Sequence, residues 1–206
     1  MELRILGPFE VFDDDGRLVD VGGARPQALL VALALAGGQP VSADQLLDLL
    51  WPDADFPARN RLQVNVSRLR KVLGGNCIVS RAGGYALEVP PGTLDADRFE
   101  DLAARGRAAL RRQDASAATR LLRQALGLWR GAPLAEFADR EFAAAVIARL
   151  REARLAALED RVEAELMLGG HGELVGELEA LVREHPLRER LWGQLMVALY
   201  RSAGAE

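Results

Sequence analysis

Residues 59–75 have the sequence RNRLQVNVSRLRKVLGG, and this stretch decides how the first half of the chain folds. It holds five basic side chains and no acidic one, with an apolar residue every three or four positions. The spacing predicts an amphipathic helix that ends at Gly74-Gly75. Three interpretations are open: a helix that reads DNA, a helix on a membrane surface, and an ordinary helix whose charges face water.

A helical projection separates two faces of this stretch. At about 100° per residue, four apolar residues fall on one stripe: Leu62, Val66, Leu69 and Leu73. The opposite face holds Asn60, Val64, Ser67, Arg68 and Lys71. Arg59 and Arg61 lie on the flanks, and Arg70 lies at the edge of the stripe.

The composition of the two faces favours DNA. A membrane-surface helix needs bulky aromatic or leucine side chains on its apolar face, and this narrow stripe has no aromatic residue. A merely solvated helix usually mixes acids with bases, which is not the case here. Val64 suits a thymine methyl group, and the amide, hydroxyl and guanidinium groups around it suit base edges and phosphates.

The segments around this helix complete a recognisable order. ELRILGPFEVF and RLVDVG predict a β-hairpin that turns at DDDG, where the three acids indicate a solvated turn rather than a cation site. RPQALLVALALAGGQ predicts a buried helix with Pro26 in its first turn. After a short PV strand, Ser42 opens a capping box, S-A-D-Q, and Pro52 ends the helix that follows. CIVSRAGGYALEV predicts a second hairpin, turning at Gly83-Gly84. This is the order of a winged helix-turn-helix with the last hairpin as the wing.

Three aromatic and basic residues lie near the basic helix in sequence, and two of them have two interpretations each. Trp51 either presents its indole N–H to a phosphate or is a core aromatic. Arg81, at the base of the hairpin turn, either reaches DNA or is an exposed arginine without a DNA role. Tyr85 is expected to pack beneath the wing.

Beyond Pro90-Pro91-Gly92 only helical periodicity remains. Helices are expected over 95–112, 115–129, 139–168, 173–184 and 187–202, with 139–168 as one long helix or two. Two helix–turn–helix segments look alike, which indicates a tetratricopeptide-like solenoid. The expected fold is therefore an α+β winged helix over 1–93 followed by an all-α domain over 94–206.

Composition limits the function classes. The 206 residues carry a net charge of −4 and are 50% apolar, as in a globular protein. Residues 59–87 nevertheless hold six basic side chains and no acid, so the overall charge does not exclude DNA. No apolar run can span a bilayer, no signal peptide is apparent, and the single Cys77 allows no disulfide, which favours the cytoplasm. His171 and His185 belong to no metal motif, so we expect no catalysis, cofactor or metal.

Two segments carry a family resemblance. LLDLLWPDADFPARNRLQVNVSRLRKVLG followed by RAGGYAL resembles the OmpR/PhoB-type winged helix. The stretches LDADRFEDLAARGRAAL, LLRQALGLWRGAPLAEF and HPLRERLWGQLMVALYRSA resemble the bacterial transcriptional activator domain. Together they resemble the Streptomyces antibiotic regulatory protein (SARP) family, including its AfsR-like members. The family's helical domain usually continues further, so either a shortened chain or part of a larger regulator would explain an end at RSAGAE. No receiver domain for phosphorylation control is found.

The resemblance implies an activator of secondary-metabolite genes. Such proteins bind direct repeats near the −35 element as side-by-side protomers and contact RNA polymerase. The implied major-groove and phosphate contacts are Asn60, Arg61, Val64, Asn65, Ser67 and Arg68, and the implied wing contacts are Arg81 and Gly83. With Arg59 and Lys71 from the projection and Trp51 from the end of the preceding helix, these residues form the expected DNA-binding set. The loop PDADFPA implies polymerase contacts at Asp53, Asp55 and Phe56. The alternative is a helical-repeat protein-interaction module whose winged helix contacts protein.

Overall fold

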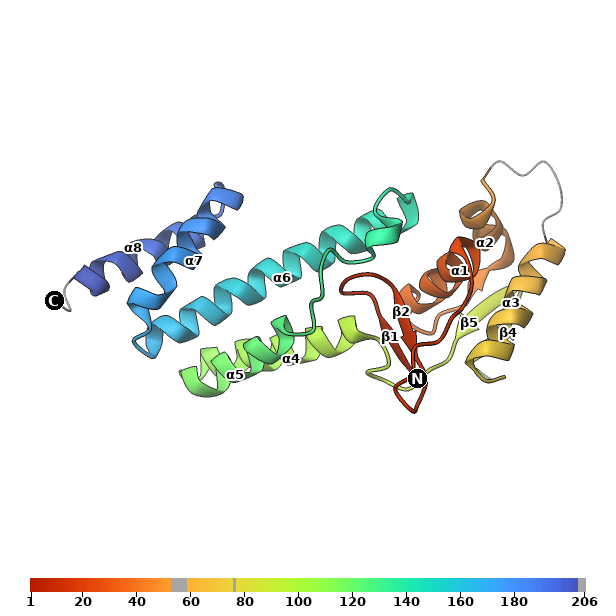
Figure 1. The fold of residues 1–206 in the computed structure, drawn as a ribbon, viewed down its shortest axis with the longest axis horizontal. Coiled ribbons are helices and arrows are strands. Elements are labelled where there is room, and N and C mark those ends of the chain that lie inside the picture. Colours follow the sequence, from red (N-terminus) through yellow and green to blue (C-terminus); the bar gives the residue numbers. More distant parts are fainter. Residues whose placement is uncertain (53–58, 76, 204–206) are drawn as a thin grey trace. The chain divides into compact units, whose positions relative to one another are not determined.

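The computed structural model describes residues 1–52, 59–75 and 77–203 (Figure 1). The chain divides into two compact units, and each is discontinuous in sequence. The first consists of Met1–Arg98 and Trp129–Leu150, and the second of Phe99–Leu128 and Arg151–Glu206.

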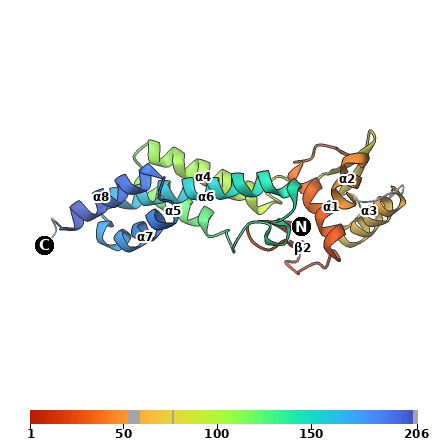
Figure 2. The same ribbon diagram turned by 90° about the horizontal axis from the view of Figure 1, so that it is seen from above.

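The first unit has the element order expected for a winged helix. Its strands are β1 (Glu2–Arg4), β2 (Glu10–Phe12), β3 (Val41–Ser42), β4 (Ile78–Arg81) and β5 (Gly84–Leu87). Its first three helices are α1 (Ala24–Leu35), α2 (Ala43–Leu50) and α3 (Arg59–Leu73). Figure 2 shows these three helices grouped together, and α3 packs on α1, α2 and β4. The predicted α+β winged helix is confirmed.

The first helices form where their local signals predict. α1 is buried over most of its circumference, and it ends before Gly37, whose φ of +58° closes the helix. In α2 the Ser42 hydroxyl accepts from the Gln45 N–H, and the Gln45 side chain accepts from the Ser42 N–H. Both halves of the predicted capping box are therefore present.

The N-terminal hairpin differs from the one predicted. ELRILGPFEVF folds back on itself, because β1 pairs antiparallel with β2 in the register Leu3↔Val11. The turn at DDDG exists, with the Asp13 N–H donating to the Arg17 carbonyl at 3.0 Å, but only Phe12 and Leu18 form a bridge beyond it. Gly7 and Pro8 interrupt the apolar run, and periodicity alone did not detect this reversal.

The backbone of Ile5 and Leu6 is held by residues far along the chain. The Asp95 carboxylate accepts the Ile5 N–H at 2.8 Å and the Leu6 N–H at 3.1 Å. The carbonyls of Leu6 and Ile5 accept from the N–H groups of Arg130 (2.8 Å) and Leu134 (2.9 Å). Burial raises the pKa of Asp95, while its two backbone donors and Arg130 oppose that shift. Segment 129–138 thus docks on the N-terminal strands.

The wing is a three-stranded antiparallel sheet in the order β3-β5-β4. The two-residue loop is Ala82-Gly83, so the turn lies one residue earlier than predicted, and Gly84 belongs to β5, opposite both Ser42 and Arg81. A Cβ on Gly84 would lie 2.0 Å from the Val41 carbonyl oxygen, so only glycine allows this close approach of β3.

The remaining helices are α4 (Asp95–Arg111), α5 (Ala115–Leu126), the 3₁₀ helix η1 (Ala135–Phe137), α6 (Glu141–Met167), α7 (His171–Glu184) and α8 (Glu189–Ala203). The stretch predicted as one helix or two is a single helix of 27 residues, α6. In the second unit, α7 and α8 form a helical hairpin (Figures 1 and 2). They share an apolar core with the C-terminal half of α6: Leu155, Val162, Leu166, Leu174, Leu178, Val182, Leu191, Leu195 and Ala198. The predicted all-α region is confirmed.

Buried charges on α6 connect the other helices of the second unit. Asp160 is 4% exposed and accepts from Arg107 of α4 (2.8 Å) and Arg190 of α8 (2.7 Å). Glu165 accepts from Arg123 of α5 at 2.8 Å and from Arg161 at 2.9 Å. These buried acids are therefore paired with arginines, as burial requires.

The faces of α3 give a stability prediction. Leu69 is 0% exposed and Val64 is 67% exposed. We expect Leu69→Ala to lower the free energy of unfolding by about 2 to 5 kcal/mol, because it leaves a cavity in the core. Val64→Ala is the matched control and should change it by less than about 0.5 kcal/mol. Urea denaturation measures both, and a Leu69→Ala variant as stable as the wild type, with the loss in Val64→Ala instead, would mean that the faces are reversed.

Candidate nucleic-acid interface

The buried stripe of α3 fixes its orientation. Leu62, Val66 and Leu69 are 1%, 2% and 0% exposed, and Leu73 at the helix end is half-buried. The predicted outer face is solvent-exposed at all five positions: Asn60, Val64, Ser67, Arg68 and Lys71. The described part of the chain places no other element over this face. α3 is therefore free to approach a partner along it.

The two flanks of α3 differ. Arg70 lies on the flank beside the wing, where its Nε donates to the Ile78 carbonyl at 2.7 Å and its Nη2 donates to the Ser80 hydroxyl at 3.1 Å. Its guanidinium also lies 5.9 Å from the centre of the Tyr85 ring. Arg70 thus ties the wing to α3, a role that its position at the stripe edge did not reveal, and Tyr85 of β5 is half-buried beside it.

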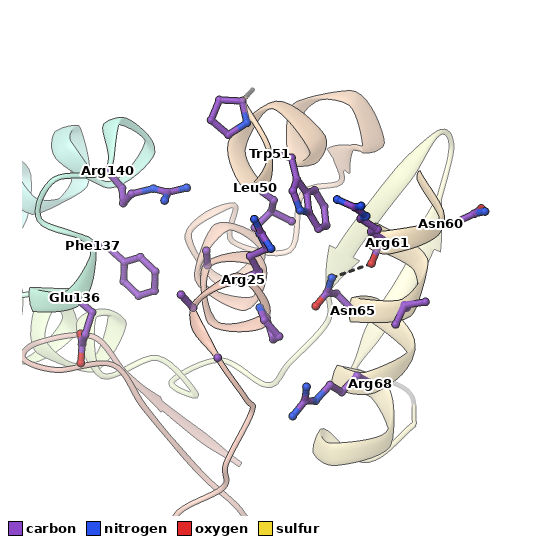
Figure 3. A pocket seen from close by; sticks show the side chains of 16 residues that line it. Arg25, Leu50, Trp51, Asn60, Arg61, Asn65, Arg68, Glu136, Phe137 and Arg140 are labelled. Carbon is purple, nitrogen blue, oxygen red and sulfur yellow. Dashed lines mark hydrogen bonds between the residues drawn. The ribbon is translucent and has the colours of Figure 1, made fainter. Parts of the chain in front are cut away.

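The other flank of α3 borders a cleft of about 1130 Å³ within the first unit. Figure 3 shows Arg61, Asn65 and Arg68 on the side of α3 that faces α1, whereas Asn60 points away. α1 contributes Arg25, and the segment around η1 contributes Glu136, Phe137 and Arg140. We call this the arginine cleft, after Arg25, Arg61, Arg68 and Arg140. A cleft with four guanidinium groups and one carboxylate suits an anionic partner.

Several contacts hold the cleft residues in place. The Asn65 side chain donates to the Arg61 carbonyl at 2.8 Å, so part of its hydrogen-bonding capacity is used within α3. The Arg68 guanidinium lies against Gly22, where an added Cβ would be 2.9 Å from Arg68 Cζ. Because Gly22 also has a φ of +96°, a side chain there would be strained and would displace Arg68.

Trp51 is a core residue in this structure. It is 8% exposed, and the Arg25 guanidinium lies 5.6 Å from the centre of its ring. Its indole N–H is buried, without a hydrogen-bond partner among the described residues. The core interpretation fits this position, since a phosphate could reach the N–H only after the side chain moved.

Two basic residues of the expected set have acidic neighbours. Arg59 is paired with Asp44 of α2 at 3.1 Å, and both side chains are largely exposed. Arg81 of the wing is paired with Glu88, the first acid after the basic stretch. Exposed pairs of this kind are weak, so a phosphate can replace the carboxylate. Gly83 is exposed at the wing tip with a φ of +78°. Asp53, Asp55 and Phe56 lie outside the described residues.

Sequence reasoning did not identify Arg25 and Arg140 as candidate residues of the interface. Arg25 stands in the first turn of a helix that looked wholly structural. Arg140 follows α3 by 67 residues or more in sequence, and it reaches the cleft because segment 129–138 docks on β1 and β2. No local pattern encodes that approach.

Among the described residues, no helix is long and apolar enough to cross a membrane. The same residues contain no group of three or more His, Cys, Asp or Glu side chains that could hold a metal ion.

The fold and this surface define the class of winged-helix transcription regulators. Comparison with known families agrees: the family described as the C-terminal domain of transcriptional regulatory proteins matches residues 22–87, and the bacterial transcriptional activator domain matches residues 94–206. The chain belongs to the SARP family of regulators, which combine these two domains.

Individual relatives show how much of each protein the chain spans. AfsR of Streptomyces coelicolor is 42% identical over 98% of this chain, which corresponds to 20% of AfsR. DnrI of Streptomyces peucetius is 37% identical over 98% of this chain and 78% of DnrI. The structure of Mycobacterium tuberculosis EmbR in complex with a low-affinity phosphopeptide matches with a TM-score of 0.91 and 33% identity, over 98% of this chain and 55% of EmbR.

The bridge from α3 to the wing can be tested with Arg70→Met. This change keeps the aliphatic stem but removes the hydrogen bonds to Ile78 and Ser80, so we expect a loss of about 1 to 3 kcal/mol in unfolding free energy. Hydrogen exchange in peptides covering 77–88 should become faster. Lys71→Met removes the same charge from an exposed neighbour and should leave wing protection unchanged. Equal protection in both variants would contradict the bridging role.

Proposed function

We propose that this chain is a sequence-specific DNA-binding activator of transcription, and that its targets are secondary-metabolite genes. The exposed, acid-free outer face of α3 carries the proposal. Its similarity to AfsR and DnrI, whose names describe regulatory proteins, supports it. We further propose that residues 1–93 supply DNA binding and that residues 94–206 supply activation.

In this proposal α3 enters the major groove. Val64 meets a thymine methyl group, while Asn60, Asn65, Ser67 and Arg68 face base edges, where amide and guanidinium groups discriminate between base pairs. Arg59, Arg61 and Lys71 are the candidate phosphate contacts, while Trp51 keeps its core position beneath Arg25. Arg81 and Gly83 bring the wing to the minor groove. Phosphate contacts position the protein, and base contacts select the sequence.

Activation would need more than one protomer. We propose side-by-side protomers on direct repeats near the −35 element, in contact with RNA polymerase, with Asp53, Asp55 and Phe56 as contact candidates. The protein would act in the cytoplasm at the nucleoid, without enzymatic activity of its own.

One observation favours the alternative of a protein-interaction module. α8 buries Leu191 and Leu195 in the core but leaves Trp192, Met196 and Tyr200 exposed at 46%, 68% and 83%. An exposed apolar face of this kind is typical of protein contacts. The two functions are separable, because loss of that face should leave duplex binding intact.

The first test is the salt dependence of duplex binding. If α3 docks among phosphates, the logarithm of the affinity should fall linearly with the logarithm of salt concentration, with a slope of about −0.9 for each neutralised phosphate. Fluorescence anisotropy with labelled 30-base-pair duplexes measures it. Binding that is insensitive to salt, or absent, would remove DNA as the partner.

The second test is Arg68→Ala. If Arg68 makes a bidentate contact with guanine, the variant should bind its selected operator more weakly by about 1 to 3 kcal/mol. Discrimination should relax at one base position, which selection from a random library would identify. A folded variant with wild-type affinity and selectivity would exclude Arg68 from the interface.

A further inference from the structure

The arginine cleft is built from three segments that are distant in sequence. α1 supplies Arg25, α3 supplies Arg61 and Arg68, and the segment after η1 supplies Arg140 (Figure 3). All four arginines are exposed, so their guanidinium groups are accessible to a ligand. The cleft lies along the flank of α3 and joins its outer face.

The acid at the cleft does not cancel these charges. Glu136 accepts from the Phe9 N–H with both carboxylate oxygens, at 3.3 and 3.0 Å. Its carboxylate is thus engaged with the backbone before β2, and no ion pair between Glu136 and a cleft arginine is found among the described residues. The cleft keeps an excess of positive charge.

Arg140 and Arg25 are each positioned by a contact within the protein and keep unused N–H donors. Arg140 donates Nη2 to the Leu49 carbonyl near the C-terminal end of α2, at 2.9 Å. Arg25 lies over the Trp51 ring at 5.6 Å. A guanidinium has five N–H donors, so one hydrogen bond or one stacked face leaves donors for a phosphate.

The dimensions of DNA decide what occupies the flanks of α3. A helix with its side chains is about 10 to 12 Å across, and the major groove is about 12 Å wide. A helix in the groove therefore has one sugar-phosphate backbone along each flank. On one flank of α3 lies the wing with Arg81, and on the other lies the arginine cleft.

We propose that the arginine cleft binds the sugar-phosphate backbone of one strand of the duplex that α3 reads, with Arg25 and Arg140 as phosphate contacts. The proposal rests on the proposed function and adds two residues from outside α3 and the wing. It also means that the segment after η1 takes part in DNA binding.

The main experiment measures salt slopes of variants of the 206-residue chain. Arg25→Gln and Arg140→Gln should each reduce the magnitude of the log–log slope by about 0.9, and the double variant by about 1.8, because each arginine neutralises one phosphate. Affinity should fall by the same factor on a selected duplex and on a scrambled duplex of equal length. Arg112→Gln, which removes an exposed charge from the turn between α4 and α5, is the matched control and should keep the wild-type slope.

A second arm separates the phosphate contact from a structural effect. Arg140→Lys keeps the charge, so it should restore the slope even if the bond to the Leu49 carbonyl is altered. Duplexes with neutral methylphosphonates placed singly along one strand should weaken wild-type binding at one or two positions. Those positions should have no effect on the Arg25→Gln/Arg140→Gln variant.

The outcomes distinguish this inference from the proposed function. A wild-type protein that does not bind duplex refutes the proposed function. Wild-type binding with a steep slope, together with cleft variants that behave like Arg112→Gln, refutes only the cleft inference. Loss of discrimination between the two duplexes would show base contacts and overturn it. Cleft variants with a normal slope that fail only to activate transcription with purified polymerase would assign the cleft to an acidic protein segment, which also overturns it.

Discussion

Burial of one stripe of α3 determines which of its side chains can meet anything outside the protein. Three residues of this stripe are almost completely buried in the core: Leu62, Val66 and Leu69. Turning the helix by one residue, about 100°, would bring Arg68 or Arg70 into the place of Leu69 and bury an unpaired guanidinium, which costs several kcal/mol. The orientation is therefore fixed by stability alone. The outer face and both flanks of α3 follow from it.

A second constraint concerns the backbone of two residues. Each N–H and carbonyl of Ile5 and Leu6 needs a partner, because both residues are buried. The Asp95 carboxylate accepts both N–H groups. The two carbonyls accept from the N–H groups of Arg130 and Leu134. The N-terminal strands are thus completed by residues from the helical half of the sequence. The same docking brings Arg140 to the C-terminal end of α2, beside α3.

The sequence was informative wherever the signal is local. The capping box at Ser42, the helix over 59–73 and the wing hairpin depend on residues within a few positions of each other, and all three formed where predicted, apart from a one-residue shift of the wing turn. The exposed face of α3 was also predictable, since helical periodicity alone assigns it. One feature that the sequence did not predict depends on a long-range contact. The arrival of Arg140 at the cleft is set by a partner 91 residues away in sequence. The fold-back at Gly7-Pro8 is local, since Leu3 pairs with Val11, and it was missed because periodicity does not detect a reversal within one apolar run.

The choice between two roles for Trp51 shows the same limit at the level of one side chain. A tryptophan at the end of an amphipathic helix suits either a phosphate or a core, and only the neighbours decide. Here Arg25 covers the ring and Leu50 is buried beside it, so the core role fits. The arginine that covers this ring comes from α1, which sequence periodicity assigned to structure alone.

The segregation of charge explains how an acidic chain can present a surface for a polyanion. At physiological ionic strength the Debye length is about 8 Å, so a bound phosphate is influenced mainly by the nearest charges. Along α3 most of these are basic, Lys71 and several arginines, with Asp44 beside Arg59 and Glu136 in the arginine cleft as the nearby acids. In the second unit, Asp160 and Glu165 are buried and paired with arginines, so these carboxylates add little field of their own. The net charge of −4 therefore hides a local segregation: residues 59–87 hold six basic side chains and no acid, whereas acids such as Asp13, Asp14 and Asp15 lie elsewhere in the sequence. A duplex on the outer face of α3 is therefore close to the basic stretch.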